Sequence, residues 1–229
     1  MITYREMKKE DIPYLLDMIW KMWAGPKVKM KPHVAIHYAE MVLYYELIHA
    51  SVAFVADDNG KAVGTCVVDI KDGHPINKDY LFRMIEGVAA MAKDPDGNDN
   101  LYHSTNVNRV FHESEEVLEG KGYGAEVALF INDEQHRGQG VGSGMFNHMA
   151  RYLHEKGVKK FYLHTDACSY HQFYGQHRGM KQLDSRPSDG SIGAIDNVTL
   201  YIYGDDVVNQ IQDWYIYTLK CVRLDRYAC

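Results

Sequence analysis

The most constraining feature of the sequence is a glycine-rich segment between an apolar run and an amphipathic one. Residues 137–144 read Arg-Gly-Gln-Gly-Val-Gly-Ser-Gly, shortly after the apolar run 128–131. This order predicts a strand, a tight turn and the first turn of a helix. Glycines let a backbone approach an anion closely, and the free N–H groups and positive dipole end of a helix N-terminus attract negative charge. The segment therefore predicts a site for a phosphorylated ligand.

The spacing of the glycines excludes two common phosphate loops. A dinucleotide fingerprint, G-x-G-x-x-G, needs a glycine five positions after its first. That position is Ser143 counted from Gly138 and Met145 counted from Gly140. A P-loop needs Gly-Lys-Ser or Gly-Lys-Thr, and neither follows these glycines.

The segment resembles instead the acetyl-CoA loop of the GNAT N-acetyltransferase superfamily, Arg/Gln-x-x-Gly-x-Gly/Ala between a strand and a helix. Arg137, Gly140 and Gly142 stand at its three fixed positions. The resemblance implies that main-chain amides of the loop hold the diphosphate of acetyl-CoA. The cofactor-binding residues that it implies are Phe130, Ile131, Arg137, Gly138, Gln139, Gly140, Val141, Gly142, Ser143, Ser169 and Phe173.

A second similarity lies about thirty residues further on. The family follows its loop with a strand and then a helix carrying Phe-Tyr before a glycine. Here a strand is expected over 158–166, because its apolar residues alternate, followed by Phe173-Tyr174 and Gly179. Gly179 stands five residues after Tyr174, where the family usually has four. Because this departure shifts the helix register, Tyr170 is a reserve candidate for the tyrosine's role.

The resemblance also implies catalytic roles. An alkylammonium acceptor has a pKa of about 10.4 and must lose a proton before it attacks a thioester. The family uses a glutamate or histidine near the strand before the loop as base, and Glu126 and His164 are the candidates, with Glu126 ranked first. A solvated carboxylate and a core histidine are the alternative interpretations of these two residues. A backbone N–H near Phe130 or Ile131 is implied as the oxyanion donor, and Tyr174 as the acid that protonates the departing thiolate.

The resemblance implies an α/β fold with a mixed central sheet flanked by helices, and the remaining patterns fall into the order expected of that fold. Acidic residues and a proline in the first turn, and apolar residues at helical spacing, indicate the helices. Two β-prone runs joined by Asp, Asn and Gly indicate a hairpin. We expect strands at 2–7, 51–56, 62–68, 128–131, 158–166, 180–183 and 198–203, and helices from residue 10 to about 22, over 33–49, and from Val141 to about Gly157.

Two segments lie outside the resemblance. Residues 71–123 form an insertion before the cofactor-loop strand, with helices expected over 77–92 and around 106–118. Leu81, Ile85, Val88 and Ala89 are expected to face inward, and the acidic segment 93–100 is expected to be a solvated turn, because its glycine is misplaced for a calcium loop. The C-terminal extension, 205–229, offers three alternatives: an added strand, a cover over a sheet edge, or a subunit interface, as in a homodimer.

Composition favours a single domain over 1–229, because 46% of the residues are apolar and 24% charged. No signal peptide or membrane-spanning run is evident, which predicts a cytoplasmic protein with no membrane partner. The four cysteines are scattered, and the pairs His148/His154 and His171/His177 lie six residues apart rather than the four of a helical zinc site, so no metal is expected. A net charge of −6 argues against nucleic acid and for a cationic acceptor.

The sequence therefore predicts an acetyl-CoA-dependent N-acetyltransferase that acts on a primary amine by direct attack in a ternary complex. A polyamine, an aminoglycoside-like antibiotic, an amino acid and a peptide N-terminus are all compatible acceptors. Two alternatives stay open. One is a non-catalytic acyl-CoA-binding or regulatory module, and the other is an unrelated nucleotide-binding α/β protein.

Overall fold

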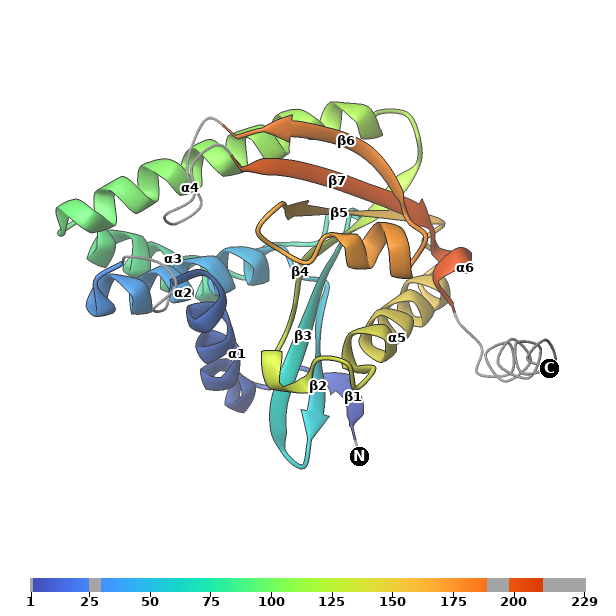
Figure 1. Cartoon of the computed structure of the whole chain (residues 1–229), viewed down its shortest axis with the longest axis horizontal. Helices are drawn as coiled ribbons and strands as arrows, with labels where there is room; N and C mark the ends of the chain where they lie inside the picture. The colour runs from blue at the N-terminus through green and yellow to red at the C-terminus, as the bar shows by residue number, and fades with distance from the viewer. Residues whose placement is uncertain (1, 25–29, 189–197, 212–229) are drawn as a thin grey trace, which may run out of the picture.

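A computed structural model of the chain describes residues 2–24, 30–188 and 198–211. Its described strands form one mixed sheet in the order β1-β2-β3-β4-β5-β7-β6, in which only the β4–β5 pair is parallel. This arrangement confirms the predicted α/β class with a mixed central sheet (Figure 1). The strands are β1 Thr3–Glu6, β2 Val52–Asp58, β3 Lys61–Ile70, β4 Tyr123–Asn132, β5 Lys160–Asp166, β6 Lys181–Pro187 and β7 Thr199–Asp206.

Helices cover both faces of the sheet. Helices α1 and α2 pack with β3 and β4 in one apolar cluster, and α5 packs on the opposite face in another. No helix in the described ranges is long and apolar enough to cross a bilayer. The main helices are α1 Ile12–Ile19, α2 Pro32–Ile48, α3 Lys78–Met91, α4 Pro95–Ser114, α5 Val141–Glu155 and α6 Val207–Gln210, with shorter turns η1 Lys9–Asp11, η2 Trp20–Ala24, η3 Glu115–Leu118, η4 Glu134–His136 and η5 Phe173–His177.

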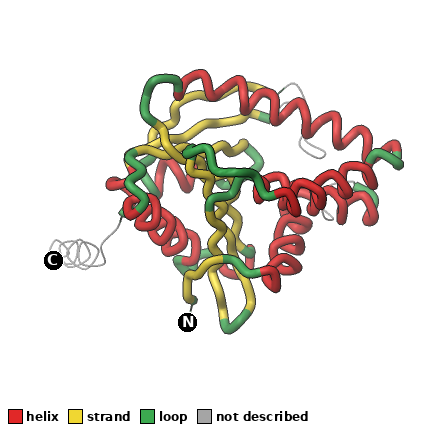
Figure 2. The backbone as a smooth tube through the Cα atoms, turned by 180° about the vertical axis from the view of Figure 1, so that it is seen from behind, coloured by secondary structure: helices red, strands yellow, loops and turns green. Residues whose placement is uncertain are grey.

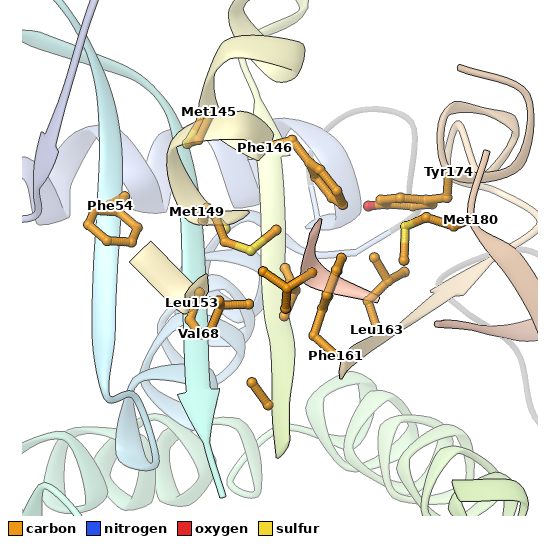
Figure 3. Packing of buried hydrophobic residues seen from close by; sticks show 14 of the residues in the cluster. Phe54, Val68, Met145, Phe146, Met149, Leu153, Phe161, Leu163, Tyr174 and Met180 are labelled. Atoms are coloured by element: carbon orange, nitrogen blue, oxygen red, sulfur yellow. The ribbon is translucent and has the colours of Figure 1, made fainter. Parts of the chain in front are cut away.

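The helix after the glycine loop packs as its apolar spacing predicts. Val141, Met145, Met149 and Leu153 recur every four residues and are all buried. Figure 3 shows three of them, Met145, Met149 and Leu153, directed at the sheet together with Phe146. This packing fixes the N-terminus of α5, and therefore the glycine loop, against the end of β4.

A β-bulge in the β3–β4 ladder changes which face each β4 residue occupies. The register shifts between Val67 and Val68, opposite residues 127–129. Val127 therefore packs on the α5 side, whereas Leu129 and Ile131 pack with α1 and α2. Glu126 lies one residue before Val127, so its side chain points to the α2 side of the sheet.

Strands β4 and β5 pair only over their first halves. The last paired residues are Val127 and Leu163, and beyond them no described strand pairs with the β5-facing edge of β4. The two strands separate toward their C-terminal ends (Figures 1 and 2). The backbone of β4 over 128–132 is therefore free to hydrogen-bond a ligand on that side.

The insertion differs from its prediction in two respects. The prediction that the acidic segment 93–100 is a solvated turn is wrong. Asp94 caps α4, Pro95 is its first residue, and the segment is helical from Pro95 onward. Gly97 permits the close approach of α4 to the end of α3, since a Cβ there would overlap the backbone of Met91. The predicted inward face of α3 is also partly wrong. Ile85 is 48% exposed and Ala89 is exposed, because α3 packs through Gly87 and Met91.

Helix α4 extends from the α2–α3 side of the molecule to β6 and β7 (Figures 1 and 2). Its residues Val107 and Val110 pack on Val198 and Leu200 beside β7, and Leu101 packs on the cluster that includes α2. The insertion thus spans the side of the sheet on which Glu126 points. Strand β6 continues to Pro187, beyond the end of the predicted strand 180–183. Residues 189–197 and the part of the C-terminal extension beyond residue 211 lie outside the described residues.

Candidate active site

The glycine loop exposes a set of backbone amides at the N-terminus of α5. Gly138 and Gly140 adopt left-handed φ angles of 75° and 77°, which side-chain-bearing residues rarely reach. The first bond of the helix joins the N–H of Gly144 to the carbonyl of Gly140, at 2.9 Å. The N–H groups of residues 138–143 donate to no described residue. These amides and the helix dipole suit an anion such as a diphosphate.

The β4 backbone presents a further donor to the gap between β4 and β5. The N–H of Asp133 donates to the carbonyl of Val63 on β3, at 2.9 Å. Because N–H directions alternate along a strand, the N–H of Ile131 also points to β3, and that of Phe130 points into the gap. Of the two predicted oxyanion donors, the register thus directs Phe130 to the gap.

Residues from the two sequence motifs meet at this gap. The ring of Phe130 on β4 stacks on that of Phe173 in η5, with centroids 5.8 Å apart. Gly142 lies under Phe130, where a Cβ would come 3.1 Å from the side-chain nitrogen Nδ2 of Asn132. Ser169 is held beside β5, because its hydroxyl and N–H both donate to Asp166. Arg137 is at the surface, with its guanidinium 3.2 Å from Glu134.

Tyr174 is buried at the edge of the gap. Its side chain is 7% exposed, and burial raises the pKa of its hydroxyl. Figure 3 shows the hydroxyl directed inward, toward the middle of the cluster that includes Phe146. The hydroxyl makes no hydrogen bond to another described residue. Tyr170, the reserve candidate, is 61% exposed and bonds His177 at 2.8 Å, so it faces away from the gap.

Both candidate bases belong to one hydrogen-bonded cluster on the α2 side of the sheet. An oxygen of Glu126 lies 3.2 Å from Nδ1 of His164, and its other oxygen accepts from Lys71 at 2.9 Å. Lys71 also donates to Asp69, at 2.6 Å. The hydroxyl of Tyr162 lies 3.2 Å from oxygens of both Glu126 and Glu115.

Opposing effects set the pKa of Glu126. Burial alone would raise the pKa, but the hydrogen bonds and charges of His164 and Lys71 outweigh it and lower the pKa to about 2. Burial would lower the pKa of Lys71, but the charges and hydrogen bonds of Glu126 and Asp69 outweigh burial and raise it. Glu126 is therefore a carboxylate at neutral pH. A carboxylate with so low a pKa is by itself a weak base.

Both ring nitrogens of His164 lie beside oxygen atoms of other residues. Nδ1 faces the Glu126 carboxylate, and Nε2 lies 3.4 Å from the hydroxyl of Ser114. That hydroxyl donates its own hydrogen to the carbonyl of Phe111 at 2.6 Å, so toward His164 it can only accept. Both ring nitrogens thus face acceptors. A neutral ring has one N–H, so it satisfies one of these two acceptors, and the second gains a donor when the ring takes up a proton.

Several members of this cluster do not follow from the sequence motifs. Lys71, Ser114 and Glu115 lie in the insertion, outside the family resemblance. Tyr162 precedes His164 by two residues on β5, so strand alternation could have placed both on one face. Glu115, Glu126 and His164 also have ligand atoms within 4.8 Å of one another, so they could hold a metal ion. The ammonium of Lys71 already forms an ion pair with Glu126.

The low pKa of Glu126 predicts a stability contribution with a defined pH range. The folded-state pKa of about 2 lies below the unfolded value of about 4.3, so the contribution is complete above about pH 5 and is lost as the pH falls through about 2. We expect the urea midpoint of the wild type to fall more between pH 6 and pH 3, values chosen on either side of about 4.3, than that of Glu126→Gln. The matched control is Glu86→Gln, which alters an exposed pair with Arg83 and should keep the wild-type pH dependence. Identical pH dependence in Glu126→Gln and wild type would contradict the ion-pair assignment.

Comparison with known proteins identifies the family. A model of the acetyltransferase (GNAT) family matches residues 16–180. The chain belongs to the GNAT acetyltransferase family. Its glycine loop and separated β4 and β5 strands lie within the matched region, as does all of the insertion.

Several solved structures share the fold at low sequence identity. A point mutant of an agmatine N-acetyltransferase, in its apo form, has 14% identity and a TM-score of 0.55, over 90% of this chain and 100% of its own. A Drosophila melanogaster polyamine N-acetyltransferase that forms N-acetylagmatine has 13% identity and a TM-score of 0.55, with the same coverage. The smu.2055 protein of Streptococcus mutans has 12% identity and a TM-score of 0.54, over 90% and 99%. No curated protein matches the sequence.

Proposed function

We propose that this chain transfers an acetyl group from acetyl-CoA to a primary amine of a small molecule or peptide by direct attack in a ternary complex. The observation that carries the proposal is the set of unpaired amides at 138–143 beside the gap between β4 and β5, in a GNAT chain. Two structural neighbours are described as agmatine and polyamine N-acetyltransferases, which supports an amine acceptor.

The proposed site has a donor group on each side of the gap. Acetyl-CoA supplies the thioester when it is bound, with its diphosphate on the loop amides. The N–H of Phe130 donates to the acetyl oxygen as negative charge develops there. Tyr174 donates its proton to the departing sulfur. Its raised pKa keeps the hydroxyl protonated until a thiolate forms.

The proton from the acceptor passes to the Glu126–His164 pair. An alkylammonium with a pKa of about 10.4 must lose a proton to attack, directly or through a water molecule. His164 takes up this proton, and the Glu126 carboxylate stabilises the resulting imidazolium through their 3.2 Å contact. We therefore assign the two candidate bases to one unit rather than to separate roles.

The test is a thiol-release assay with acetyl-CoA and a panel of amines. We expect CoA release to depend on both the protein and the amine, with an equal amount of N-acetylated product found by mass spectrometry. Binding of acetyl-CoA without release in the presence of any amine would indicate the non-catalytic module. Thermal stabilisation by ATP or NAD and none by acetyl-CoA would overturn the cofactor assignment.

A further inference from the structure

The contact between Glu126 and His164 lacks a hydrogen atom in one of the two neutral forms of the ring. Nδ1 of His164 lies 3.2 Å from an oxygen of Glu126, and Nε2 lies 3.4 Å from the Ser114 hydroxyl. That hydroxyl donates to the carbonyl of Phe111, so it offers Nε2 an acceptor only. With the ring hydrogen on Nε2, the lone pair of Nδ1 faces a carboxylate oxygen. A proton or a metal ion between these two atoms would bond to both.

The distance between these two atoms fits a shared metal ion. A tetrahedral zinc ion with bonds of about 2.0–2.1 Å separates its ligand atoms by about 3.3–3.4 Å. The 3.2 Å between Nδ1 of His164 and Oε1 of Glu126 is close to this value. Glu115 supplies a third ligand, because ligand atoms of all three residues lie within 4.8 Å of one another. A water molecule would complete the coordination, as in zinc sites with three protein ligands.

The hydroxyl of Tyr162 lies between the two carboxyl groups of this set. It is 3.2 Å from an oxygen of Glu115 and 3.2 Å from an oxygen of Glu126. A phenol has one hydrogen, so it can donate to only one of the two carboxylates. Carboxylates this close to one another repel, and a bound cation would offset the repulsion.

Neighbouring residues hold the ligands in the orientation that metal binding needs. Lys71 pairs with Oε2 of Glu126 at 2.9 Å, so Oε1 stays directed at His164. Lys71 also pairs with Asp69 at 2.6 Å, which reduces the repulsion between its ammonium and a metal ion. The hydroxyl of Ser114 suits a hydrogen on Nε2. Metal-bound histidines almost always donate their other N–H to such an acceptor.

The ligand types favour zinc over magnesium or calcium. Zinc binds imidazole as well as carboxylates, whereas magnesium and calcium prefer oxygen ligands. The side chains of His164, Glu126 and Glu115 are 12%, 18% and 30% exposed, so the set is partly open to solvent. The three residues lie on β5, on β4 and in η3, so no sequence spacing reveals them as a set.

We propose that Glu115, Glu126 and His164 form a zinc site, and that Zn²⁺ bound there inhibits acetyl transfer by occupying the position of the proton on the Glu126–His164 pair. Zinc binding follows from the geometry of the three side chains. Its inhibitory effect rests on the proposed function, in which this pair takes the proton of the amine. The third ligand, Glu115, comes from the insertion.

The first test measures Zn²⁺ binding to the full chain without acetyl-CoA, by competition with a fluorescent zinc chelator. Glu115→Gln should raise the Kd for Zn²⁺ about tenfold or more, the range for disturbing a metal site. Glu126→Gln should weaken binding as well. Zn²⁺ should raise the Tm of the wild type more than that of either variant, because a ligand stabilises the folded state that binds it. Mg²⁺ at the same concentration should give a smaller shift in Tm.

The second test measures inhibition of amine acetylation, with the N-acetylated product quantified by mass spectrometry. Zn²⁺ should lower the wild-type rate, and a chelator should restore it. Glu115→Gln should keep kcat/KM without zinc nearly unchanged, and should need about tenfold or more Zn²⁺ for the same inhibition. The matched control is Glu116→Gln, which alters the next carboxylate in η3, exposed and 3.8 Å from Arg186. It should keep the wild-type zinc affinity and inhibition.

The possible outcomes separate the metal site from the enzymatic function. Equal Zn²⁺ affinity in the wild type and Glu115→Gln would overturn the site, because the ion would then bind other residues. An equal shift in Tm with Mg²⁺ would overturn the choice of zinc. Zinc binding at this site without inhibition would overturn the overlap with the proton of the Glu126–His164 pair. Absence of product with every amine, with zinc binding intact, would instead contradict the proposed function and leave the metal site standing.

Discussion

Replacing Gly140 with valine is expected to weaken acetyl-CoA binding by about 100-fold or more, the effect of losing several charge-assisted hydrogen bonds to a diphosphate. Gly140 has a φ of 77° and directly precedes the first turn of α5. A β-branched residue disfavours this conformation strongly, so the loop must rearrange and its amides no longer converge. The measurement is titration calorimetry of acetyl-CoA into wild type and variant.

The matched control is Gly157→Val at the opposite end of the same helix. Gly157 also has a φ of 77°, and a Cβ there would meet no atom within 4 Å, as at Gly140. Both variants should lose similar stability in urea unfolding, but only Gly140→Val should lose acetyl-CoA binding. Retained binding in Gly140→Val would mean that the diphosphate lies elsewhere and that the loop is only a helix cap.

The elements with strong local signals were predicted correctly from the sequence. The hairpin of β2 and β3 is joined by Asp-Asn-Gly, and in the structure Asn59 and Gly60 both have positive φ, as such turns require. Helix α5 has apolar residues every four positions and ends at a left-handed Gly157. In both cases short-range chemistry alone determines the conformation.

Errors arose where distant contacts decide the structure. The Asp-Pro pair at 94–95 is a helix-start signal, but Gly97 and the polar residues around it are typical of a loop. Only the structure shows that Gly97 packs on Met91 within a helix. The periodicity of α3 favoured Ile85 as inward, whereas the close approach of Gly87 to α2 turns Ile85 outward. Local patterns do not contain the position of the partner helix.

The candidate site was predictable in its motifs but not in its electrostatics. Glu126, His164 and Tyr174 were expected from the resemblance, and the structure brings Glu126 and His164 within 3.2 Å. The ion pair of Glu126 with Lys71 joins residues 55 positions apart, so no local pattern reveals it. The bulge in β4 is equally hidden, because one extra residue reverses the strand's faces without changing its composition.

Tyr174→Phe is expected to lower kcat by about 100-fold or more, within the range for loss of a general acid, with little change in acetyl-CoA affinity. The variant removes only the hydroxyl, which makes no hydrogen bond to a described residue, so the packing of the ring against Phe146 should persist. Steady-state kinetics and calorimetry separate the two effects. The matched control is Tyr170→Phe, which removes an exposed hydroxyl bonded to His177 and should leave kcat nearly unchanged.

The alkaline side of the pH profile gives an independent check on Tyr174. Because burial raises the pKa of its hydroxyl, the proton needed by the departing thiolate stays in place above the pH at which an exposed tyrosine, with a pKa of about 10, would lose it. Wild-type kcat should therefore show no decline from this group up to about pH 10. An unchanged kcat in Tyr174→Phe would mean that the thiolate leaves unprotonated or takes its proton from water. Burial of Tyr174 would then reflect packing alone.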